Sequence, residues 1–122
     1  MAHLDVAGGL LILRLSLLER LAGFVRGNAE IPLSSVRGAR IVESPWGELR
    51  GMRMPGTAVP RRLAVGTWRF SGGKDFVALH GGGQAVVVDL VGVEYSRLIV
   101  STGHGIDLIV DEINEAAGGR LR

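Results

Sequence analysis

Short apolar runs separated by glycine-containing turns fill the second half of the chain, and this pattern predicts a fold rich in β-strands. Glycines lie between the runs at residues 71–73 and 81–83, where each cluster is typical of a hairpin turn. A connection at residues 91–95 leads to the last run. The predicted strands are residues 63–70, 74–80, 84–90 and 96–101.

The first half of the chain adds three predicted strands, after a loose end at residues 1–7. These strands are residues 9–15, 24–31 and 36–43. Ser16 and Glu19 form a capping box, which predicts a short leucine-rich helix that ends near Ala22. We expect this helix to close one end of the core, with an exposed helix that docks a partner or touches a membrane as the alternative.

The last segment has the pattern of an amphipathic helix, and Gly118 and Gly119 are expected to end it. Its apolar face consists of Ile106, Ile109, Val110, Ile113 and Ala116. Its acidic face consists of Asp107, Asp111, Glu112 and Glu115. We predict that the apolar face is buried against the open end of a half-open barrel.

Residues 46–68 interrupt the strand pattern and read WGELRGMRMPGTAVPRRLAVGTW. The first half of this stretch does not alternate, so residues 48–67 are interpreted as an ordered, irregular loop. Pro55 and Pro60 stiffen the segment, and Gly51 and Gly56 let its backbone turn sharply.

Seven strands followed by one terminal helix predict a mainly β protein with a half-open barrel of two sheets, capped by the helix. This order of elements resembles the pleckstrin-homology-like (PH-like) fold. The stretch RGMRMPGT…P…AVGTW resembles a family of small bacterial proteins with such a domain and no assigned activity. The resemblance implies a single PH-like domain over residues 1–122, with its core at about 9–117. Another small β-barrel and a lipocalin-like cup that binds a small ligand are the alternatives.

Charge is distributed unevenly along the chain, although the formal net charge is only +2. Residues 37–69 contain seven arginines and two glutamates, whereas residues 103–117 contain four acidic residues and no Lys or Arg. The molecule is therefore expected to be electrically lopsided. The sequence contains no cysteine, and its longest run without formal charge, residues 76–88, is too short to span a membrane. These features predict a soluble, cytoplasmic protein.

The histidines do not form a catalytic or metal-binding pattern, since His3, His80 and His104 lie far apart and outside any known motif. Asp75 and His80 share a predicted strand but point to opposite faces. The glycines at 81–83 are followed by a strand and not by the helix that a dinucleotide site requires. We therefore expect a protein that is not an enzyme and has no cofactor and no metal site.

The candidate site is the arginine-rich part of residues 48–67, because a guanidinium binds a carboxylate or phosphate through two hydrogen bonds. Its proposed binding residues are Arg50, Arg53, Arg61 and Arg62. The expected partner is an acidic protein or a small anion. A structural loop whose arginines pair with Glu43, Glu48 and the acidic helix is the alternative.

The sequence also bears on three further classes of partner. A nucleic acid is an alternative that the aromatic content of 5% disfavours, because single-stranded nucleic acids need exposed aromatic side chains for stacking. A membrane lipid is disfavoured because the segment after the first strand is leucine-rich and has only Arg20 and Arg26 as basic residues. A homodimer is predicted because the first strand and the short helix contain more leucine than one small core needs.

Overall fold

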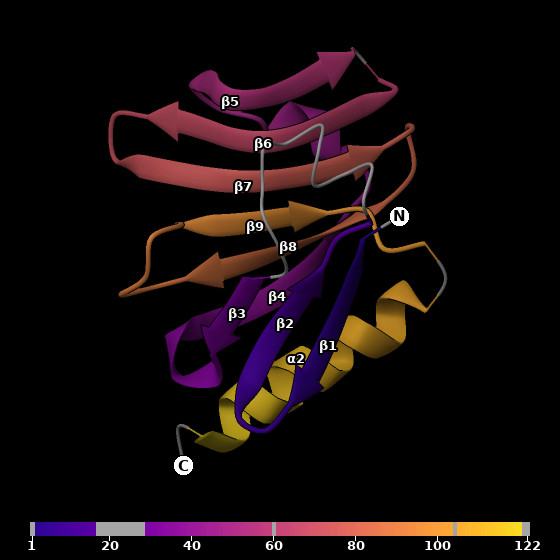
Figure 1. Ribbon diagram of the computed structural model, residues 1–122. Coiled ribbons are helices and arrows are strands. Elements are labelled where there is room, and N and C mark those ends of the chain that lie inside the picture. The colour runs from indigo at the N-terminus through magenta and orange to yellow at the C-terminus, as the bar shows by residue number, and fades with distance from the viewer. Residues whose placement is uncertain (1, 17–28, 60, 104, 121–122) are drawn as a thin grey trace.

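Two β-sheets and one long helix make up the fold in the computed structural model, which describes residues 2–16, 29–59, 61–103 and 105–120 (Figure 1). The smaller sheet contains β1 (His3–Ala7), β2 (Leu10–Arg14) and β3 (Ala29–Pro32). The larger sheet contains β4 (Val36–Val42), β5 (Met52–Val59), β6 (Leu63–Phe70), β7 (Gly73–His80), β8 (Ala85–Leu90) and β9 (Arg97–Val100). The helices are η1 (Leu33–Ser35), η2 (Pro45–Glu48) and α2 (Ile106–Arg120).

The mainly β class, the two sheets and the C-terminal helix are confirmed, but the sheets do not close into a barrel. The described residues form nine strands where the sequence predicts seven. One additional strand is β1, in the segment that was interpreted as a loose end. Gly8 and Gly9, at φ 59° and 79°, join β1 to β2 in a tight turn, a hairpin signal that the sequence interpretation missed.

The larger sheet has the strand order β4-β8-β9-β7-β6-β5, so strands that follow one another in the sequence are not always neighbours in the sheet. β9 lies between β7 and β8, and it pairs in parallel with β7 and antiparallel with β8. Its backbone is therefore bonded on both sides, and all four of its residues are buried. This insertion places Arg97, the first residue of β9, between Asp75 of β7 and Asp89 of β8.

The predicted irregular loop at residues 48–67 is wrong, because most of it forms the antiparallel hairpin of β5 and β6. β5 lies at the edge of the sheet, where a proline is tolerated because one side of the strand needs no ladder hydrogen bond. The register shifts between Arg53 and Gly56, on either side of Pro55. Glycine and proline thus interrupt the alternation pattern of this edge strand, which is why the sequence does not predict it.

Two apolar clusters lie on opposite faces of the larger sheet. The first is enclosed by the smaller sheet and α2, and its members include Leu11, Leu13, Phe76, Val88, Leu98 and Ile113. The second is covered by the segment around η2, and its members include Trp68, Val77, Leu79, Val87 and Ile99. Trp46 and Leu49 of that segment pack onto the second cluster, and the Trp46 indole Nε1 donates a hydrogen bond of 2.7 Å to the Gly81 carbonyl oxygen. This anchoring places the following residues, Glu48 and Arg50, on the same face of the sheet.

The helix α2 packs along β4 (Figure 1) and not into the end of a barrel. Val110 and Ile113 are buried as predicted, whereas Ile106 and Ile109 are half-buried. Asn114 receives a hydrogen bond of 2.7 Å from the Ala39 N–H and donates one of 2.9 Å to the Ala39 carbonyl oxygen. The helix thereby satisfies part of the outer edge of β4.

Some sequence predictions fall elsewhere or outside the described residues. The helix continues past Gly118 and Gly119, because glycine lowers helix propensity by about 1 kcal/mol and does not forbid the helix. The predicted helix at residues 17–22 and residues 24–28 of the second predicted strand lie outside the described residues. No helix in the described ranges is long and apolar enough to cross a membrane.

Candidate functional site

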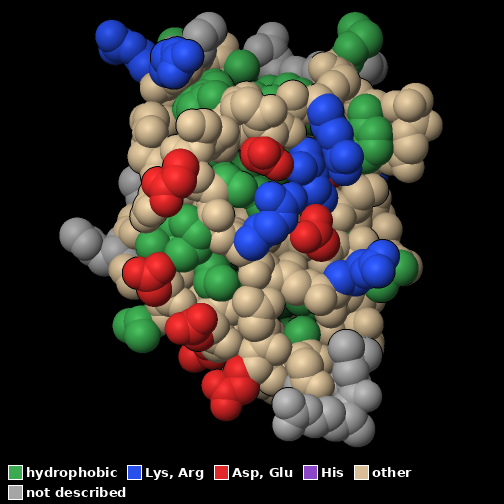
Figure 2. Space-filling model, turned by 180° about the vertical axis from the view of Figure 1, so that it is seen from behind, with side chains coloured by type: hydrophobic (Ala, Val, Ile, Leu, Met, Phe, Trp, Pro, Cys, Tyr) green, Lys and Arg blue, Asp and Glu red, His purple; other side chains and the backbone are tan. Residues whose placement is uncertain are grey.

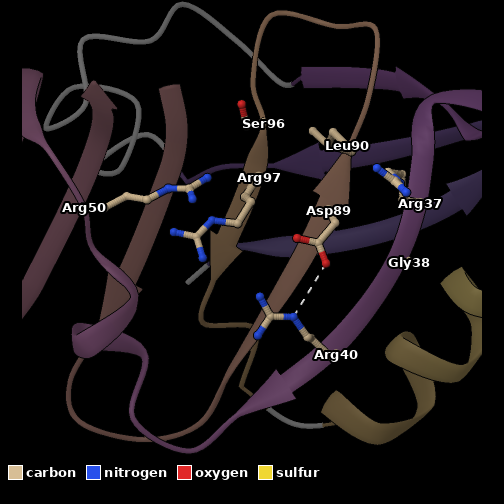
Figure 3. A pocket seen from close by; sticks show the side chains of 8 residues that line it. All are labelled: Arg37, Gly38, Arg40, Arg50, Asp89, Leu90, Ser96 and Arg97. Atoms are coloured by element: carbon tan, nitrogen blue, oxygen red, sulfur yellow. Dashed lines mark ion pairs between the residues drawn. The ribbon is translucent and has the colours of Figure 1, made fainter. Parts of the chain in front are cut away.

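A hollow of about 480 Å³ lies on the face of the larger sheet that η2 partly covers. We call it the arginine hollow, and Figure 3 shows Arg50 and Arg97 on one side of it and the β4 residues on the other. The residues that line it are Arg37, Gly38, Arg40, Arg50, Asp89, Leu90, Ser96 and Arg97. Figure 2 shows the same face, with blue Lys and Arg side chains gathered near its middle.

The floor of the arginine hollow consists of side chains that the pairing of β7, β8 and β9 places next to one another. Asp89, Arg97 and Asp75 are direct cross-strand neighbours on β8, β9 and β7. Side chains two residues apart on a strand share a face, so Asp75 lies on the same face as Val77, and Arg97 on the same face as Ile99. On each strand, the charged side chain therefore lies on the same face as apolar side chains of the second apolar cluster.

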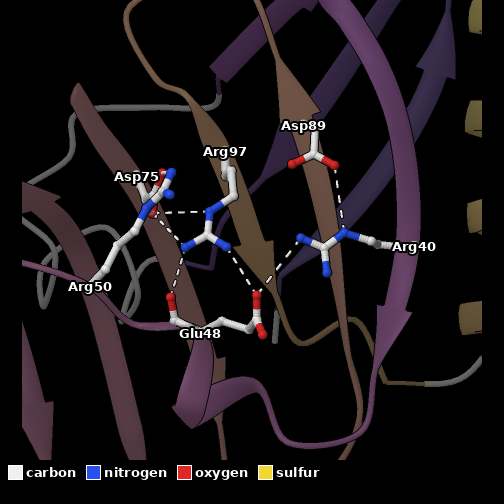
Figure 4. A network of polar contacts seen from close by, with 6 residues as sticks. All are labelled: Arg40, Glu48, Arg50, Asp75, Asp89 and Arg97. Atoms are coloured by element: carbon white, nitrogen blue, oxygen red, sulfur yellow. Dashed lines mark hydrogen bonds and ion pairs between the residues drawn. The ribbon is translucent and has the colours of Figure 1, made fainter. Parts of the chain in front are cut away.

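All three nitrogen atoms of the Arg97 guanidinium donate hydrogen bonds, which go to Asp75 and Glu48 (Figure 4). Its Nε and Nη2 donate hydrogen bonds of 3.1 and 2.8 Å to Asp75 Oδ2. Its Nη1 donates to Glu48 Oε1 at 3.0 Å, and its Nη2 also donates to the Glu48 carbonyl oxygen at 2.7 Å. The Asp75 and Arg97 side chains are 1% and 10% exposed, so this pair is largely removed from water.

The environment of Arg97 fixes its charge. Burial alone lowers the pKa of Arg97, but the hydrogen bonds and negative charges of Asp75 and Glu48 outweigh burial and raise the pKa above its ordinary value. Arg97 consequently stays protonated at any pH at which the protein folds, and it acts as a permanent positive charge.

Arg50, one of the predicted site residues, contacts the other side of Asp75. Its Nε and Nη2 donate hydrogen bonds of 2.9 and 3.2 Å to the two Asp75 carboxylate oxygens. Its guanidinium also lies 3.8 Å from the centre of the Phe70 ring, a cation–π contact. These contacts orient Arg50, although 43% of its side chain is exposed.

The outer arginines are held much less firmly. Arg40 lies 3.8 Å from Glu48 and 3.6 Å from Asp89, distances too long for hydrogen bonds, and 48% of its side chain is exposed. Arg37 is exposed and makes no ion pair with any other described residue. The donors of both guanidinium groups thus remain largely available beside the rigid inner pair.

The other predicted site residues lie away from the arginine hollow or cannot be placed. The backbone of Arg53 pairs with Trp68 on β6, and its side chain lies outside the described residues. Arg61 and Arg62 are exposed in the turn between β5 and β6. β5 has 8 residues, so this turn lies on the order of 25 Å from Arg50. The structure does not bring Arg61 and Arg62 together with Arg50.

Sequence reasoning missed the residues that line the arginine hollow with Arg50, which are Arg37, Arg40, Asp89 and Arg97, and it missed Asp75, whose carboxylate Arg50 binds. The sequence contained a signal for two of them. Asp75 shares a strand face with Val77, and Arg97 shares one with Ile99, so both charged side chains are expected beside buried apolar ones. A buried acid and a buried base in two neighbouring strands indicate an ion pair.

The structural alternative, in which the arginines of residues 48–67 pair with Glu43, Glu48 and the acidic helix, is not found among the described side chains, where Arg50 pairs with Asp75 instead. Glu48 pairs with Arg97 and Arg40, whereas Glu43 accepts a hydrogen bond from Gln84. Within the described ranges, no carboxylate of α2 forms an ion pair with an arginine.

Comparison of the chain with protein-family models, with curated proteins and with solved structures finds no match. Among the residues that the structure describes, no group of three or more His, Asp or Glu side chains is placed to hold a metal ion. The evidence for the function of the arginine hollow therefore lies in its own contacts and charges.

Gly51 provides a test of how the site is built. Its φ is +79°, and a Cβ at this position would collide with the backbone carbonyl group of Arg69. Gly51→Ala should lower the free energy of unfolding by at least about 1–2 kcal/mol, the cost of a left-handed backbone alone, and it should displace Arg50. Urea denaturation measures the loss. Gly47→Ala is the matched control, because no atom lies within 4 Å of its Cβ position and its φ is not positive. Equal stabilities for the two variants would contradict this account of Gly51.

Proposed function

We propose that this protein is a non-enzymatic binding domain that engages an anionic ligand or an acidic protein partner through the arginine hollow. The observation that carries the proposal is the convergence of Arg37, Arg40, Arg50 and Arg97 on one hollow of about 480 Å³. A planar guanidinium binds carboxylates and phosphates in a bidentate manner, so several arginines around one hollow favour an anion.

The inner and outer arginines have different roles in this proposal. Arg97 and Arg50 are fixed by Asp75 and Glu48, so their charges need no reorganisation when a ligand arrives. The two outer arginines supply the open donors. The hollow and these two carboxylates together contain four arginines and three acids, which leaves an excess positive charge for the ligand.

The residues of the arginine hollow are suited to holding charge and not to transferring protons. A guanidinium does not lose its proton in proteins, so none of the four arginines can serve as a general base. Asp89, the acid among the lining residues, faces Arg40 at 3.6 Å. This chemistry supports binding as the role of the hollow.

Family and location belong to the same proposal. The stretch at residues 50–68 supports the PH-like assignment, and a binding domain without activity is in keeping with it. The lack of cysteine suits a reducing compartment, and we propose the cytoplasm.

The experiment compares two double charge reversals that change the net charge equally. The probes are a hexaglutamate peptide and sodium phosphate, titrated into isotopically labelled protein at low salt and followed by backbone amide NMR shifts. Arg37→Glu with Arg40→Glu should weaken binding on the order of 100-fold, because each lost charge-assisted hydrogen bond is worth about 1.5–3 kcal/mol. Shifts in the parent protein should centre on residues 37–40, 50 and 96–97.

Arg61→Glu with Arg62→Glu is the matched control, since both residues are exposed in the distant turn. We expect this variant to bind both probes like the parent protein. The opposite outcome, in which only this variant loses binding, would assign the site to the β5–β6 turn. Two results would contradict the proposed function: a parent protein that binds neither probe, or an Arg37→Glu, Arg40→Glu variant that binds both probes as well as the parent does.

A further inference from the structure

The exposed face of α2 is strongly acidic. Asp107, Asp111 and Glu115 are spaced four residues apart and form one stripe, with Glu112 beside it, and all four side chains are exposed. Like charges at this spacing destabilise a helix by about 0.2–0.5 kcal/mol for each pair. Within the described residues none of these carboxylates forms an ion pair. The described residues thus provide no ion-pair partner inside the monomer for this acidic face.

The arginine hollow lies next to this acidic face. Asn114 of α2 bonds to both backbone groups of Ala39, which stands on β4 between Arg37 and Arg40. Figure 2 shows both charges on one face of the molecule, with the blue side chains near the middle and a run of red ones along the side where α2 lies. Two patches of opposite sign thus lie side by side without neutralising each other.

We infer that the acidic partner of the arginine hollow is α2 of a second copy of this chain, in a closed two-fold dimer. The inference rests on the proposed function, because it assigns a partner to the same hollow. A two-fold axis between two adjacent patches places the acidic face of each copy over the arginine hollow of the other, so both contacts form at once. Complementary potentials of this kind fix register and exclude wrong partners.

An exposed leucine on α2 supplies an apolar contact for the same interface. Leu108 is 76% exposed, and Asp111 and Glu112 are its neighbours at i+3 and i+4 on the helix surface. Among the leucines that motivated a homodimer in the sequence, Leu11, Leu13 and Leu15 of the first predicted strand are buried in the core, and those of the predicted short helix lie outside the described residues.

The size of the face sets the expected strength of the dimer. α2 has 15 residues and is about 22 Å long, and the strands beside it are about 4.8 Å apart. The helix is about 10 Å wide and three strand spacings add about 15 Å, so the face measures about 22 by 25 Å. Such a face gives roughly 1,100 Å² of buried surface for both copies, near the lower limit for stable interfaces. The dimer should thus be reversible and sensitive to salt, since its contacts are largely electrostatic.

A charge-swap experiment tests the inference. The hollow variant carries Arg37→Glu and Arg40→Glu, and the helix variant carries Asp111→Lys and Glu115→Lys. By sedimentation equilibrium the parent protein should form a dimer whose dissociation constant rises at least tenfold between 50 and 500 mM NaCl. Each variant alone should dimerise at least tenfold more weakly than the parent, because like charges then face each other in both contacts.

An equimolar mixture of the two variants should form a heterodimer of nearly parental affinity, because its two contacts again join opposite charges. Arg61→Glu with Arg62→Glu is the control for net charge and should dimerise like the parent. Circular dichroism tests whether each variant is folded. Arg37→Gln replaces the hollow variant if that variant is unfolded, and Glu112→Gln replaces the helix variant if that one is unfolded. With these milder variants, weakened dimers are the expected result.

Three results would overturn the inference: a parent protein that stays at 13.0 kDa at millimolar concentration, a dimer that neither variant weakens, or a mixture without heterodimer. Binding of hexaglutamate distinguishes this failure from failure of the proposed function. A monomer that binds the peptide through residues 37–40 keeps the arginine hollow as a site and loses only the self-association.

Discussion

Asp75→Ala should lower the free energy of unfolding by about 3–5 kcal/mol. The Asp75 side chain is 1% exposed, and its two oxygens accept hydrogen bonds from Arg97 and Arg50. Without it, the largely buried Arg97 guanidinium keeps only the contacts to Glu48, and most of its charge is left uncompensated. Urea denaturation followed by tryptophan fluorescence measures the loss, because Trp68 is the cross-strand neighbour of Asp75.

A double-mutant cycle isolates the buried pair. Arg97→Ala alone leaves Asp75 with only the half-exposed Arg50, whereas the double variant leaves neither charge unpaired in the core. The double variant should therefore be less destabilised than the sum of the two single variants, by about 1–3 kcal/mol. Additive effects would mean that the Asp75–Arg97 pair does not couple as its geometry indicates.

The sequence predicted those strands that form an apolar run between two clear turns. β4, β6, β7 and β8 lie within one or two residues of their predicted positions, because each has an apolar face that must be buried. β5 was missed because it lies at the sheet edge, where Pro55 and a register shift are tolerated. The position of β9 between β7 and β8 could not be predicted, since local alternation does not determine which strands pair.

The candidate site was only partly predictable, for a related reason. Arg50, Arg61 and Arg62 are close in sequence, but an intervening strand of 8 residues separates Arg50 from the other two in space. Conversely, Arg97 lies 47 residues after Arg50, and both bind the same carboxylate. Local density of arginine thus identified one residue that lines the arginine hollow, whereas the pairing of β7 with β9 places Arg97 beside it.

The packing of the larger sheet links the core to the site. Arg97 and Asp75 face each other because β9 pairs with β7, and Glu48 reaches Arg97 because η2 lies on the second apolar cluster. The inner arginines are therefore positioned by the same packing that stabilises the fold. A substitution in the second cluster should accordingly disturb the arginine hollow, whereas one beneath α2 should mainly change stability.

Ile113→Ala should lower the free energy of unfolding by about 2–4 kcal/mol, because it removes three carbons from a site with no solvent access. Ile113 is 0% exposed and lies in the first apolar cluster, where α2 meets β4 and the smaller sheet. The loss is measured by urea or thermal denaturation of the purified protein.

Two other positions on α2 serve as controls for helix propensity and burial. Ile109→Ala removes the same atoms from a half-buried position and should cost less than Ile113→Ala. Leu108→Ala changes a side chain that is 76% exposed and should alter the stability of the monomer by less than about 0.5 kcal/mol. The three losses should therefore follow the burial of the three side chains. If Ile113→Ala unfolds like the parent protein, α2 does not pack on the sheet through this face, and the acidic face would not point outward as the dimer requires.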